Sequence, residues 1–467
     1  MSEIDTVTQH PSPENADIGE HAAVMAEGSR LLRHQDPELA QLLDQEVVHQ
    51  ESTLAMVAHA SLAHPSVLSA AGSVLGNLTV EGYPRSRYHP GSTVFDGVEE
   101  LAVHRAKEAF GARYANVQPH SCSSANLSVL FGLLLPGDTL LGMDLDAGGH
   151  LTHGASASVT GRYFRVVRYG LDSQGLIDYD QVARLARRHR PKLIVAGASA
   201  YPRTIDYARF RAVADEVGAY LLADISHIAG LVAAGTHPSP IDIAHITTTS
   251  TYKQLGGPRG GLILIGREWD TPSPDGGTTL ARLMQRAVFP RSQGTPNPSA
   301  IAAKARALAL VAQPAFKELA ARIVANARSL SARLVDLGHQ VLTGGTDNHM
   351  LLLGLSDRQL TGLVAEQALE SCGILANRNR IPGDTKPPLV AGGLRLGTNI
   401  VSQRGMGAAE MKVCAELVAL VLDNVAVLSD TEYELDAAVG TTVRDTVRQL
   451  CRQYPVDHYR SLSSPRG

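Results

Sequence analysis

Residues 220–266 read YLLADISHIAGLVAAGTHPSPIDIAHITTTSTYKQLGGPRGGLILIG, and the architecture can be inferred outward from them. Three apolar runs of strand length stand in this segment: YLLADIS, HITTTS and GGLILIG. Asp224 lies near the end of the first run, and Lys253 follows the second. Parallel sheets bind their ligands beside the carboxyl ends of strands. The segment therefore predicts a parallel sheet with a functional site near Asp224 and Lys253.

The same alternation of strand-like and helix-like lengths extends over residues 96–265. Further strand candidates are ANVQPH, TLLGMD, FRVVRYG and KLIVAGAS, and the helical stretches include VEELAVHRAKEAFG, YDQVARLARRH and YARFRAVADEVG. This alternation predicts an α/β fold with a mostly parallel sheet and helices on both of its faces. After residue 298, long helical stretches and shorter strand candidates predict a second, smaller α/β domain.

Composition divides the chain into four predicted segments. Residues 1–33 are rich in Ser, Pro, Glu and Asn, and we expect them to be a disordered N-terminal arm. Residues 34–94 begin with a helical pattern and end in the loop GNLTVEGYPRSRYHPGS, and loops of this length usually carry function. We expect residues 95–298 to form the large domain and residues 299–467 the small one.

The overall composition is that of a globular protein without a nucleic-acid or membrane partner. Hydrophobic residues make up 44% of the chain, enough for a sizeable core, and the formal charge of −4 gives no basic surface for nucleic acid. The four cysteines lie far apart without a CxxC pair, so neither disulfides nor a metal site is predicted. No targeting peptide and no apolar run of about 18 residues is visible. We therefore expect a cytoplasmic location.

Asp224 and Lys253 together suit a pyridoxal phosphate site. A carboxylate can keep the ring nitrogen of that cofactor protonated, and a lysine can form the Schiff base. Ser121, Cys122 and Ser123 stand between the strand candidate ANVQPH and the helical stretch NLSVLFGLL, where small side chains and free N–H groups suit a phosphate. Each feature alone has a structural alternative, since a lone lysine is usually solvated and a serine cluster can simply cap a helix.

Motifs along most of the chain resemble one family. The stretches EGYPRSRY, YANVQPHS, GDTLLGMD, GGHLTHG, SAYPRTIDY, DISHIAGLVAAG, YKQLGGPRGGLIL, IPGDTKPP and GGLRLGT, from about residue 36 to about 423, resemble serine hydroxymethyltransferase. The resemblance implies a fold-type I pyridoxal phosphate enzyme, similar in fold to aspartate aminotransferase, with a seven-stranded sheet. It also implies a homodimer or homotetramer with shared active sites, to which residues 34–94 contribute.

The resemblance implies roles for individual residues as well. Lys253 corresponds to the Schiff-base lysine, Asp224 to the partner of the ring nitrogen and His150 to the imidazole stacked on the ring. Arg395 corresponds to the arginine that binds the substrate carboxylate, and Glu81 to a glutamate from the neighbouring subunit that transfers protons. Further expected contacts to the cofactor or the substrate come from Ser121, Cys122, Ser123, Ser199, His227, Tyr252, Gly294, Thr295 and Tyr88.

Several departures from the family pattern surround this predicted site. His59 replaces a serine that helps to bind the substrate carboxylate, and His89 replaces an active-site tyrosine. Both are expected to be substrate-binding residues here. The other departures are Thr79 for a tyrosine, Cys122 for a glycine, Tyr252 for a histidine, Thr295 for a glycine, and Pro387, Pro388 and Leu389 for the SPF motif that lies against the folate.

These features lead to a hypothesis with alternatives. The resemblance implies an enzyme that cleaves and forms the Cα–Cβ bond of β-hydroxy-α-amino acids such as serine and threonine. The departures favour a folate-independent L-threonine transaldolase or aldolase that acts with an acceptor aldehyde. The alternative is a tetrahydrofolate-dependent hydroxymethyltransferase of serine or α-methylserine, so the need for tetrahydrofolate stays open. A non-catalytic scaffold, or an aminotransferase or decarboxylase of the same fold, are the remaining alternatives.

Overall fold

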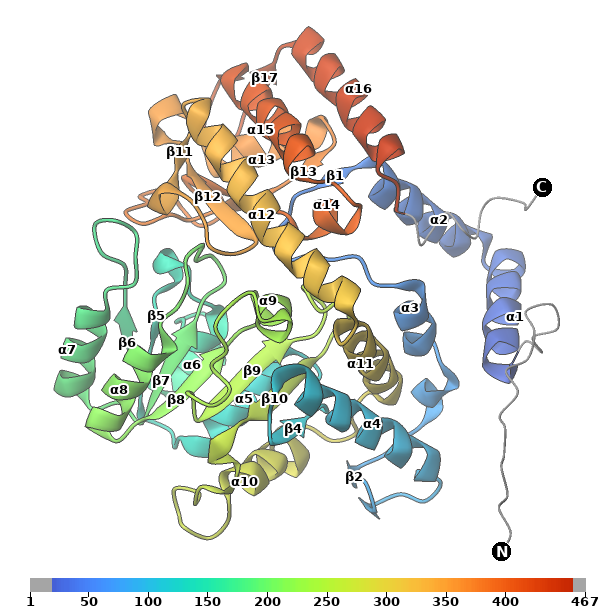
Figure 1. Cartoon of the computed structure of the whole chain (residues 1–467), viewed down its shortest axis with the longest axis vertical. Coiled ribbons are helices and arrows are strands. Elements are labelled where there is room, and N and C mark those ends of the chain that lie inside the picture. Colours follow the sequence, from blue (N-terminus) through green and yellow to red (C-terminus); the bar gives the residue numbers. More distant parts are fainter. Residues whose placement is uncertain (1–18, 457–467) are drawn as a thin grey trace, which may run out of the picture.

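The computed structural model describes residues 19–456, which form a large and a smaller body (Figure 1). The large body is built on a seven-stranded sheet with the order β4-β10-β9-β8-β7-β5-β6, where the strands are β4 (Tyr114–Asn116), β5 (Thr139–Met143), β6 (Arg165–Tyr169), β7 (Leu193–Gly197), β8 (Tyr220–Asp224), β9 (Ile246–Ser250) and β10 (Gly261–Ile265). Neighbouring strands from β6 to β9 are parallel, whereas β10 is antiparallel to both β9 and β4. The predicted mostly parallel sheet is confirmed.

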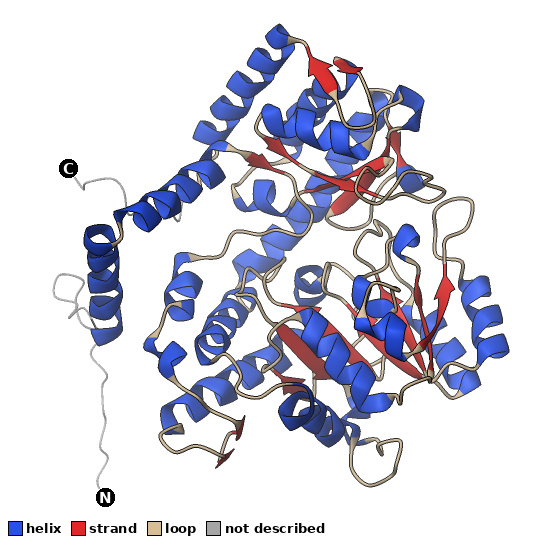
Figure 2. Ribbon diagram, turned by 180° about the vertical axis from the view of Figure 1, so that it is seen from behind, coloured by secondary structure: helices blue, strands red, loops and turns tan. Residues whose placement is uncertain are grey.

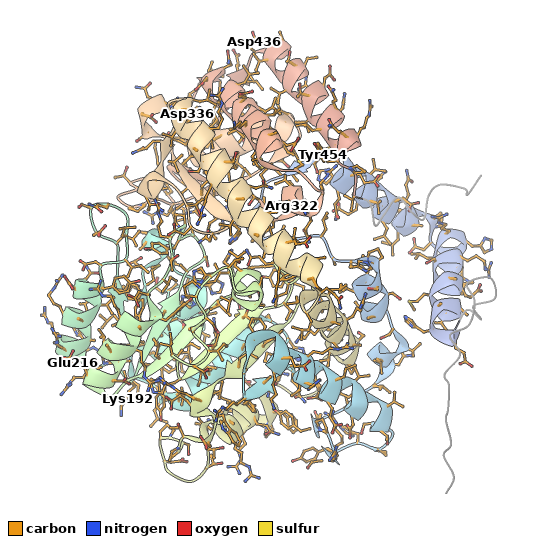
Figure 3. All side chains as sticks on the ribbon, in the orientation of Figure 1. Lys192, Glu216, Arg322, Asp336, Asp436 and Tyr454 are labelled. Atoms are coloured by element: carbon orange, nitrogen blue, oxygen red, sulfur yellow. The ribbon has the colours of Figure 1, made fainter. Side chains whose placement is uncertain are left out.

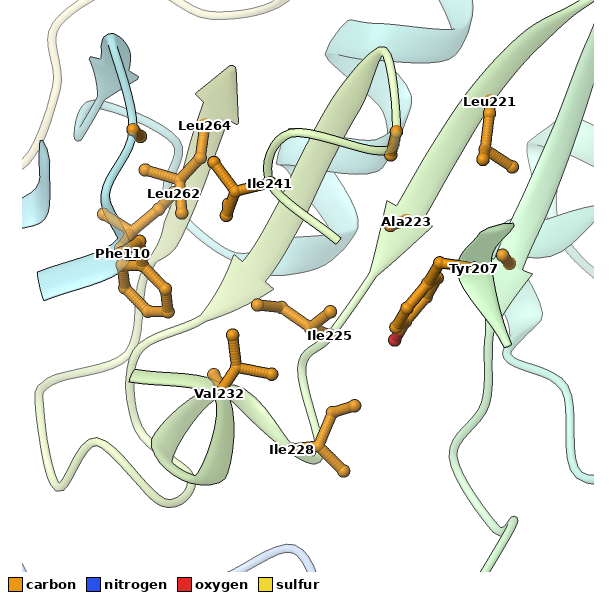
Figure 4. Close-up of a cluster of buried hydrophobic side chains, with 14 of the residues drawn as sticks. Phe110, Tyr207, Leu221, Ala223, Ile225, Ile228, Val232, Ile241, Leu262 and Leu264 are labelled. Atoms are coloured by element: carbon orange, nitrogen blue, oxygen red, sulfur yellow. The ribbon is translucent and has the colours of Figure 1, made fainter. Parts of the chain in front are cut away.

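Burial on both faces explains why strands such as β7 (LIVAG) and β10 (GLILI) are wholly apolar. Leu262 and Leu264 of β10 pack into one core together with Leu221, as Figure 4 shows. The alternate residues Ile263 and Ile265 belong to the core on the opposite face of the sheet. Because successive side chains of a strand point to opposite faces, a strand covered on both sides needs apolar residues throughout.

Helices cover both faces of the large sheet (Figure 2). The first core lies under α4 (Thr93–Phe110), α7 (Tyr179–His189), α8 (Tyr207–Val217), α9 (Ala229–Ala234) and α11 (Pro298–Val311). The second lies under α5 (Cys122–Leu133) and α10 (Leu280–Arg286), and the short helix α6 (Val159–Tyr163) precedes β6.

The smaller body contains a four-stranded antiparallel sheet with its own core. The sheet has the order β11-β12-β15-β14, formed by β11 (Gln340–Val341), β12 (Met350–Gly354), β14 (Asn377–Asn379) and β15 (Gly393–Gly397). Its other elements are α13 (Gly362–Ser371), α14 (Asn399–Gln403), α15 (Ala408–Asp423), α16 (Ala437–Gln453) and the hairpin of β16 (Val425–Val427) and β17 (Tyr433–Leu435). The long helix α12 (Pro314–Asp336) passes both bodies, and Figure 3 marks it at Arg322 and Asp336.

The N-terminal segment enters the smaller body before the chain builds the large one. Strand β1 (Leu54–Ala55) pairs in parallel with β13 (Ile374–Leu375), and Leu54 lies in the core of the smaller body. Arg404 fixes this segment further, because its guanidinium donates to the carbonyl oxygens of Glu51 and Thr53. The chain then continues through α3 (Pro65–Ala71) and the hairpin of β2 (Gly82–Tyr83) and β3 (Ser86–Arg87) to the large body.

Two predictions about the segments need correction. Residues 1–18 of the predicted disordered arm lie outside the described residues, but residues 20–33 belong to the helix α1 (Glu20–Gln35), which is followed by α2 (Pro37–Ser52). The polar composition gave the wrong prediction here because α1 buries no residue, so its sequence lacks the apolar face by which a helix is usually recognised. The predicted boundary at 298 also separates α11 from the core in which it packs. We therefore propose a boundary between α11 and α12, and the division into domains stays a proposal. No helix within residues 19–456 has the length and apolar character to cross a membrane.

Candidate active site

A cavity of about 140 Å³ lies at the carboxyl ends of the parallel strands. Asp224 is the last residue of β8, Lys253 follows β9, and Ser121 caps the start of α5. The fold therefore brings together the two residues on which the sequence prediction rested. The cavity is lined by Ser121, Cys122, Ser123, His150, His153, Ala198, Ser199, Asp224, Ser226, His227, Tyr252, Lys253 and Arg259.

Asp224 is an ionised carboxylate held by four donor groups. Its Oδ1 accepts hydrogen bonds from the backbone N–H and the hydroxyl of Ser226, at 3.0 and 2.6 Å. Its Oδ2 accepts from Asn126 Nδ2 at 2.8 Å and from His153 Nε2 at 3.0 Å. Burial raises the pKa of this carboxyl, but the hydrogen bond and the charge of His153 and the hydrogen bond from Ser226 outweigh burial and hold the pKa well below its usual range. The carboxylate is therefore suited to keep a bound ring nitrogen protonated.

Lys253 is a buried amine beside this carboxylate. Only 7% of the residue is exposed, and this burial lowers the pKa of the amine, although the charge of Asp224 opposes the shift. A lysine with a lowered pKa loses its proton more readily than a lysine in water, and the neutral amine can act as a nucleophile. Tyr252, which replaces the family histidine, is stacked against Arg259, whose guanidinium carbon lies 4.1 Å from the ring centroid.

The residues predicted for the phosphate lie at the start of α5. Ser121 does cap this helix, because its Oγ accepts from Ser124 N at 3.0 Å, and Ser123 lines the cavity beside it. The thiol of Cys122 points to Asp224 instead: its Sγ lies 3.6 Å from Asp224 Oδ1, to which the thiol can donate, and 2.9 Å from the hydroxyl oxygen of Ser226. Burial raises the pKa of this thiol well above its usual range, so it stays protonated. Only the backbone of Cys122 is thus available to a phosphate.

Two imidazoles at the cavity are neutral. Burial, followed by the charge of His153, lowers the pKa of His150 to about 4, and its Nδ1 lies 2.8 Å from the hydroxyl of Thr152. Burial and the charge of Lys253 lower the pKa of His227 well below its usual range. Within the described part of the chain, the buried Nδ1 of His227 has no hydrogen-bond partner. An orphaned polar atom in a cavity wall fits a site built for a polar ligand.

Arg395 of β15 in the smaller body lies beside this cavity, since it contacts Ser199 of the cavity lining. It donates from Nη1 to the backbone oxygen of Ser199 at 2.6 Å, from Nε to Asn377 Oδ1 at 3.2 Å, and from Nη2 to His59 Nδ1 at 3.2 Å. These bonds leave one N–H on each terminal nitrogen, the number that a bidentate carboxylate requires. Burial lowers the pKa of Arg395 to about 10, so the guanidinium stays charged at neutral pH.

His59 accepts from Arg395 because it is neutral. Burial lowers the pKa of His59 to about 4, and the charges of Arg395, Lys253 and Arg259 add to this effect. With Nδ1 occupied as an acceptor, the proton of the neutral ring is on Nε2. His59 thus lies beside Arg395, the arginine expected to bind the substrate carboxylate, and the contact of either residue with a substrate stays a prediction.

A second group of predicted residues does not line this cavity. His89 Nε2 lies 3.6 Å from Glu81 Oε2, and a Cβ on Gly294 would lie 3.0 Å from Glu81 Oε1. Tyr88 is 73% exposed and packs its ring against Phe289. These residues, together with the neighbouring Thr79 and Thr295, are separate from the Lys253 cavity of the same chain. Their predicted roles require another subunit and remain predictions.

Several residues that hold the site were not predicted from the sequence. His153 stands three positions after His150 in GGHLTHG, so its spacing offered a signal, and Asn126 lies one turn into the helix capped by Ser121. Ser226 likewise lies two positions beyond Asp224. His349 offered no such signal: it is fully buried, its ring stacks on His227 with centroids 6.0 Å apart, and its Nε2 donates to Ala58 O at 3.1 Å.

His349 should make stability depend on pH. Burial lowers its pKa to about 3, so the unfolded chain takes up a proton below about pH 6.5 while the folded protein does not. The stabilisation is therefore complete above pH 6.5 and is lost as the pH falls. We expect His349→Gln, whose amide can still donate to Ala58 O, to lose about 2 kcal/mol less unfolding free energy than wild type between pH 7 and pH 5. Urea unfolding at both pH values measures this difference, and parallel losses in the two proteins would contradict it.

The donor set fits pyridoxal phosphate. A carboxylate, a lysine, hydroxyl and N–H groups at a helix start and an orphaned imidazole nitrogen share one cavity, and each matches one part of that cofactor. Asp224 would hold the ring nitrogen, Lys253 the aldehyde carbon, and the start of α5 the phosphate.

Comparisons with known proteins agree with this geometry. The family model described as serine hydroxymethyltransferase matches residues 32–418. The serine hydroxymethyltransferase of Synechococcus sp. (strain JA-3-3Ab) is 47% identical over 439 residues, covering 91% of this chain and 97% of the relative. That of Halorhodospira halophila (strain DSM 244 / SL1) is 46% identical over 421 residues, covering 90% and 97%, and that of Rhodospirillum centenum (strain ATCC 51521 / SW) is 47% identical over 437 residues, covering 92% and 99%. The chain therefore belongs to the serine hydroxymethyltransferase family, whose members are pyridoxal phosphate enzymes that cleave and form Cα–Cβ bonds of amino acids.

Proposed function

We propose that this enzyme transfers a hydroxymethyl group between serine and tetrahydrofolate. This is the alternative of the sequence analysis, and we now prefer it to the folate-independent reaction. The observation that carries it is the name of the relatives, which match at 46–47% identity over almost their whole length. The departures at Cys122 and Tyr252 also weigh less than expected, because both side chains pack against site residues and remove no donor from Asp224.

The residues of this chain divide the work as follows. Bound in the cavity, pyridoxal phosphate supplies an electron sink for the pair of electrons released when the Cα–Cβ bond breaks. Asp224 keeps a proton on the ring nitrogen, and Arg395 binds the substrate carboxylate with its two remaining N–H groups. Fixing the carboxylate orients the Cα–Cβ bond for cleavage. Glu81 receives and returns the proton of the substrate hydroxyl.

We further propose that the active enzyme is a homodimer, or a tetramer of such dimers. The site is otherwise incomplete, because Glu81 and His89 do not line the cavity of their own chain. The first two helices support the proposal: α1 buries no residue, and α2 exposes the apolar side chains of Leu39, Leu42, Leu43, Val47 and Val48.

Product analysis tests the proposed reaction. Purified enzyme is incubated with L-serine with and without tetrahydrofolate, and glycine is measured. We expect glycine formation to depend strictly on tetrahydrofolate. In a parallel reaction the enzyme receives L-threonine and an acceptor aldehyde without folate. Formation of acetaldehyde and a new β-hydroxy amino acid there, without folate-dependent serine turnover, would contradict the proposal.

The folate-independent transaldolase remains the second candidate because of one observation. His59, a serine in the family, occupies one Nη2 N–H of Arg395 and alters the surroundings of the substrate carboxylate. The variant His59→Ser distinguishes the two reactions. For a hydroxymethyltransferase, we expect the ratio of serine to threonine turnover to change less than about fivefold, whereas a specialised transaldolase would shift at least about tenfold towards serine.

A further inference from the structure

Lys304 of α11 is a fully buried lysine that forms no ion pair with any residue of the described chain. It is 2% exposed, and its Nζ donates to the carbonyl oxygens of Val117 at 2.6 Å, Pro119 at 3.0 Å and Gly261 at 3.1 Å. Burial lowers the pKa of Lys304 to about 7. A buried lysine is costly, and three backbone acceptors that match its three donors indicate a specific structural task.

Glu99, the acidic residue whose charge acts on Lys304, does not pair with this lysine. Glu99 contributes to the charge around Lys304, but its carboxylate accepts from Arg87 at 2.6 Å and from Gln118 at 2.8 Å. The hydrogen-bond partners of Lys304 are therefore the three carbonyl groups that surround it, and not a carboxylate.

The three carbonyl groups belong to the segments that carry the start of α5. Val117 and Pro119 lie in the turn between β4 and Ser121, the residue that caps α5. Gly261 begins β10 and joins the same turn, because its N–H donates to Pro119 O at 2.9 Å. A Cβ on Gly261 would collide with the backbone oxygen of Ser121, and one on its neighbour Gly260 would collide with the Lys304 side chain. Lys304, β10 and the turn are thus packed in direct contact.

The direction of these carbonyl groups affects how well an anion can bind at the start of α5. A phosphate at the start of α5 needs N–H groups facing it and is repelled by carbonyl oxygens. The oxygens of Val117, Pro119 and Gly261 are instead directed to the buried ammonium group of Lys304, a residue outside the cavity lining. Without those hydrogen bonds the turn would lose two of the contacts that fix its orientation, at Val117 and Pro119, and would keep the one between Gly261 N and Pro119 O.

We propose that Lys304 is a positioning residue for the cofactor phosphate, acting through the carbonyl groups of Val117, Pro119 and Gly261. It orients the turn so that the N–H groups and hydroxyls from Ser121 to Ser123 face the phosphate. This inference rests on the proposed placement of the phosphate at those residues.

The test compares the affinities of the cofactor-free protein for pyridoxal phosphate and for pyridoxal, which differ only in the phosphate. Absorbance titration gives both dissociation constants, and their ratio is the phosphate preference. We expect Lys304→Met to lower this preference at least about tenfold while changing the pyridoxal constant less than about threefold. The control is Val311→Ala, which weakens the same helix in its core without contact to the turn and should keep the wild-type preference. An unchanged preference in Lys304→Met, or an equal loss in Val311→Ala, would overturn the inference.

Two further variants keep the test decisive. If Lys304→Met does not fold, Lys304→Gln replaces it, since its amide keeps two of the three N–H donors; a folded Gln variant with wild-type preference would also overturn the inference. Ser123→Ala tests the phosphate placement independently. Loss of preference in Ser123→Ala but not in the Lys304 variants refutes the role of Lys304 alone. No loss in any of these variants refutes the placement of the phosphate as well.

Discussion

Lys253→Ala should reduce amino-acid turnover at least about a thousandfold and remove the visible absorption band of the covalently held cofactor. The reason is geometric as well as chemical. Lys253 is buried at the carboxyl end of β9 within reach of the Asp224 charge, and the other lysine of this region, Lys304, is bound to three carbonyl groups behind the turn. Among residues 19–456, no second amine lines the cavity to replace it.

The control for this variant is Lys192→Ala, an exposed lysine before β7 that should leave both turnover and absorption unchanged (Figure 3). Substantial turnover by Lys253→Ala would refute the assignment of this lysine. A wild-type protein that shows neither the band nor turnover would instead support the non-catalytic scaffold.

Asp224→Asn should have a comparable effect, a loss of at least about a thousandfold in kcat, with a second effect on stability. The amide cannot keep the ring nitrogen protonated, so the electron sink is weakened. In addition, Asn126 and His153 both donate to Oδ2, and Ser226 donates twice to Oδ1. An NH2 group on either side would face donors, which costs about 1–3 kcal/mol of unfolding free energy.

Turnover and urea unfolding, measured on the same preparation, separate these two effects. Asp172→Asn is a suitable control because this carboxylate lies in a loop outside the cavity, where it accepts only backbone N–H groups of its own turn. A folded Asp224→Asn enzyme with more than about a tenth of the wild-type kcat would show that the charge of Asp224 is not needed.

Local patterns predicted the large sheet well because its strands are buried on both faces. Runs such as LIVAG in β7 and GLILI in β10 cannot form a half-exposed strand, and their lengths are too short for helices. Composition gave the wrong prediction for α1, a helix that contributes no residue to a core. EHAAVMAEGSRLLRHQ is polar enough to resemble a solvated arm, yet its Ala, Glu, Leu and Arg residues are good helix formers, and the structure has a helix there.

Within the site, residues in short local motifs could likewise be predicted from the sequence, whereas contacts between distant residues could not. Asp224, Lys253 and the start of α5 were predictable from local patterns, because each follows a strand or begins a helix, whereas His150 was expected only from the resemblance of GGHLTHG to the family. The hydrogen bond from Arg395 to His59 joins residues 336 positions apart, so no local pattern could place them together. Nor could a pattern predict that the Cys122 thiol points to the carboxylate, since this depends on one side-chain rotamer in a packed site.

The pairing of β1 with β13 also determines when the smaller body can fold during synthesis of the chain. Leu54 and Met56 are translated before the large body, yet the other members of the core of the smaller body begin only at Leu330. All seven strands of the large sheet leave the ribosome in the interval. A nascent chain that ends before Ile374 can therefore fold the large body while Leu54 and Met56 still lack their partner strand β13. We expect these two apolar residues to be accessible to chaperones until β13 has been synthesised.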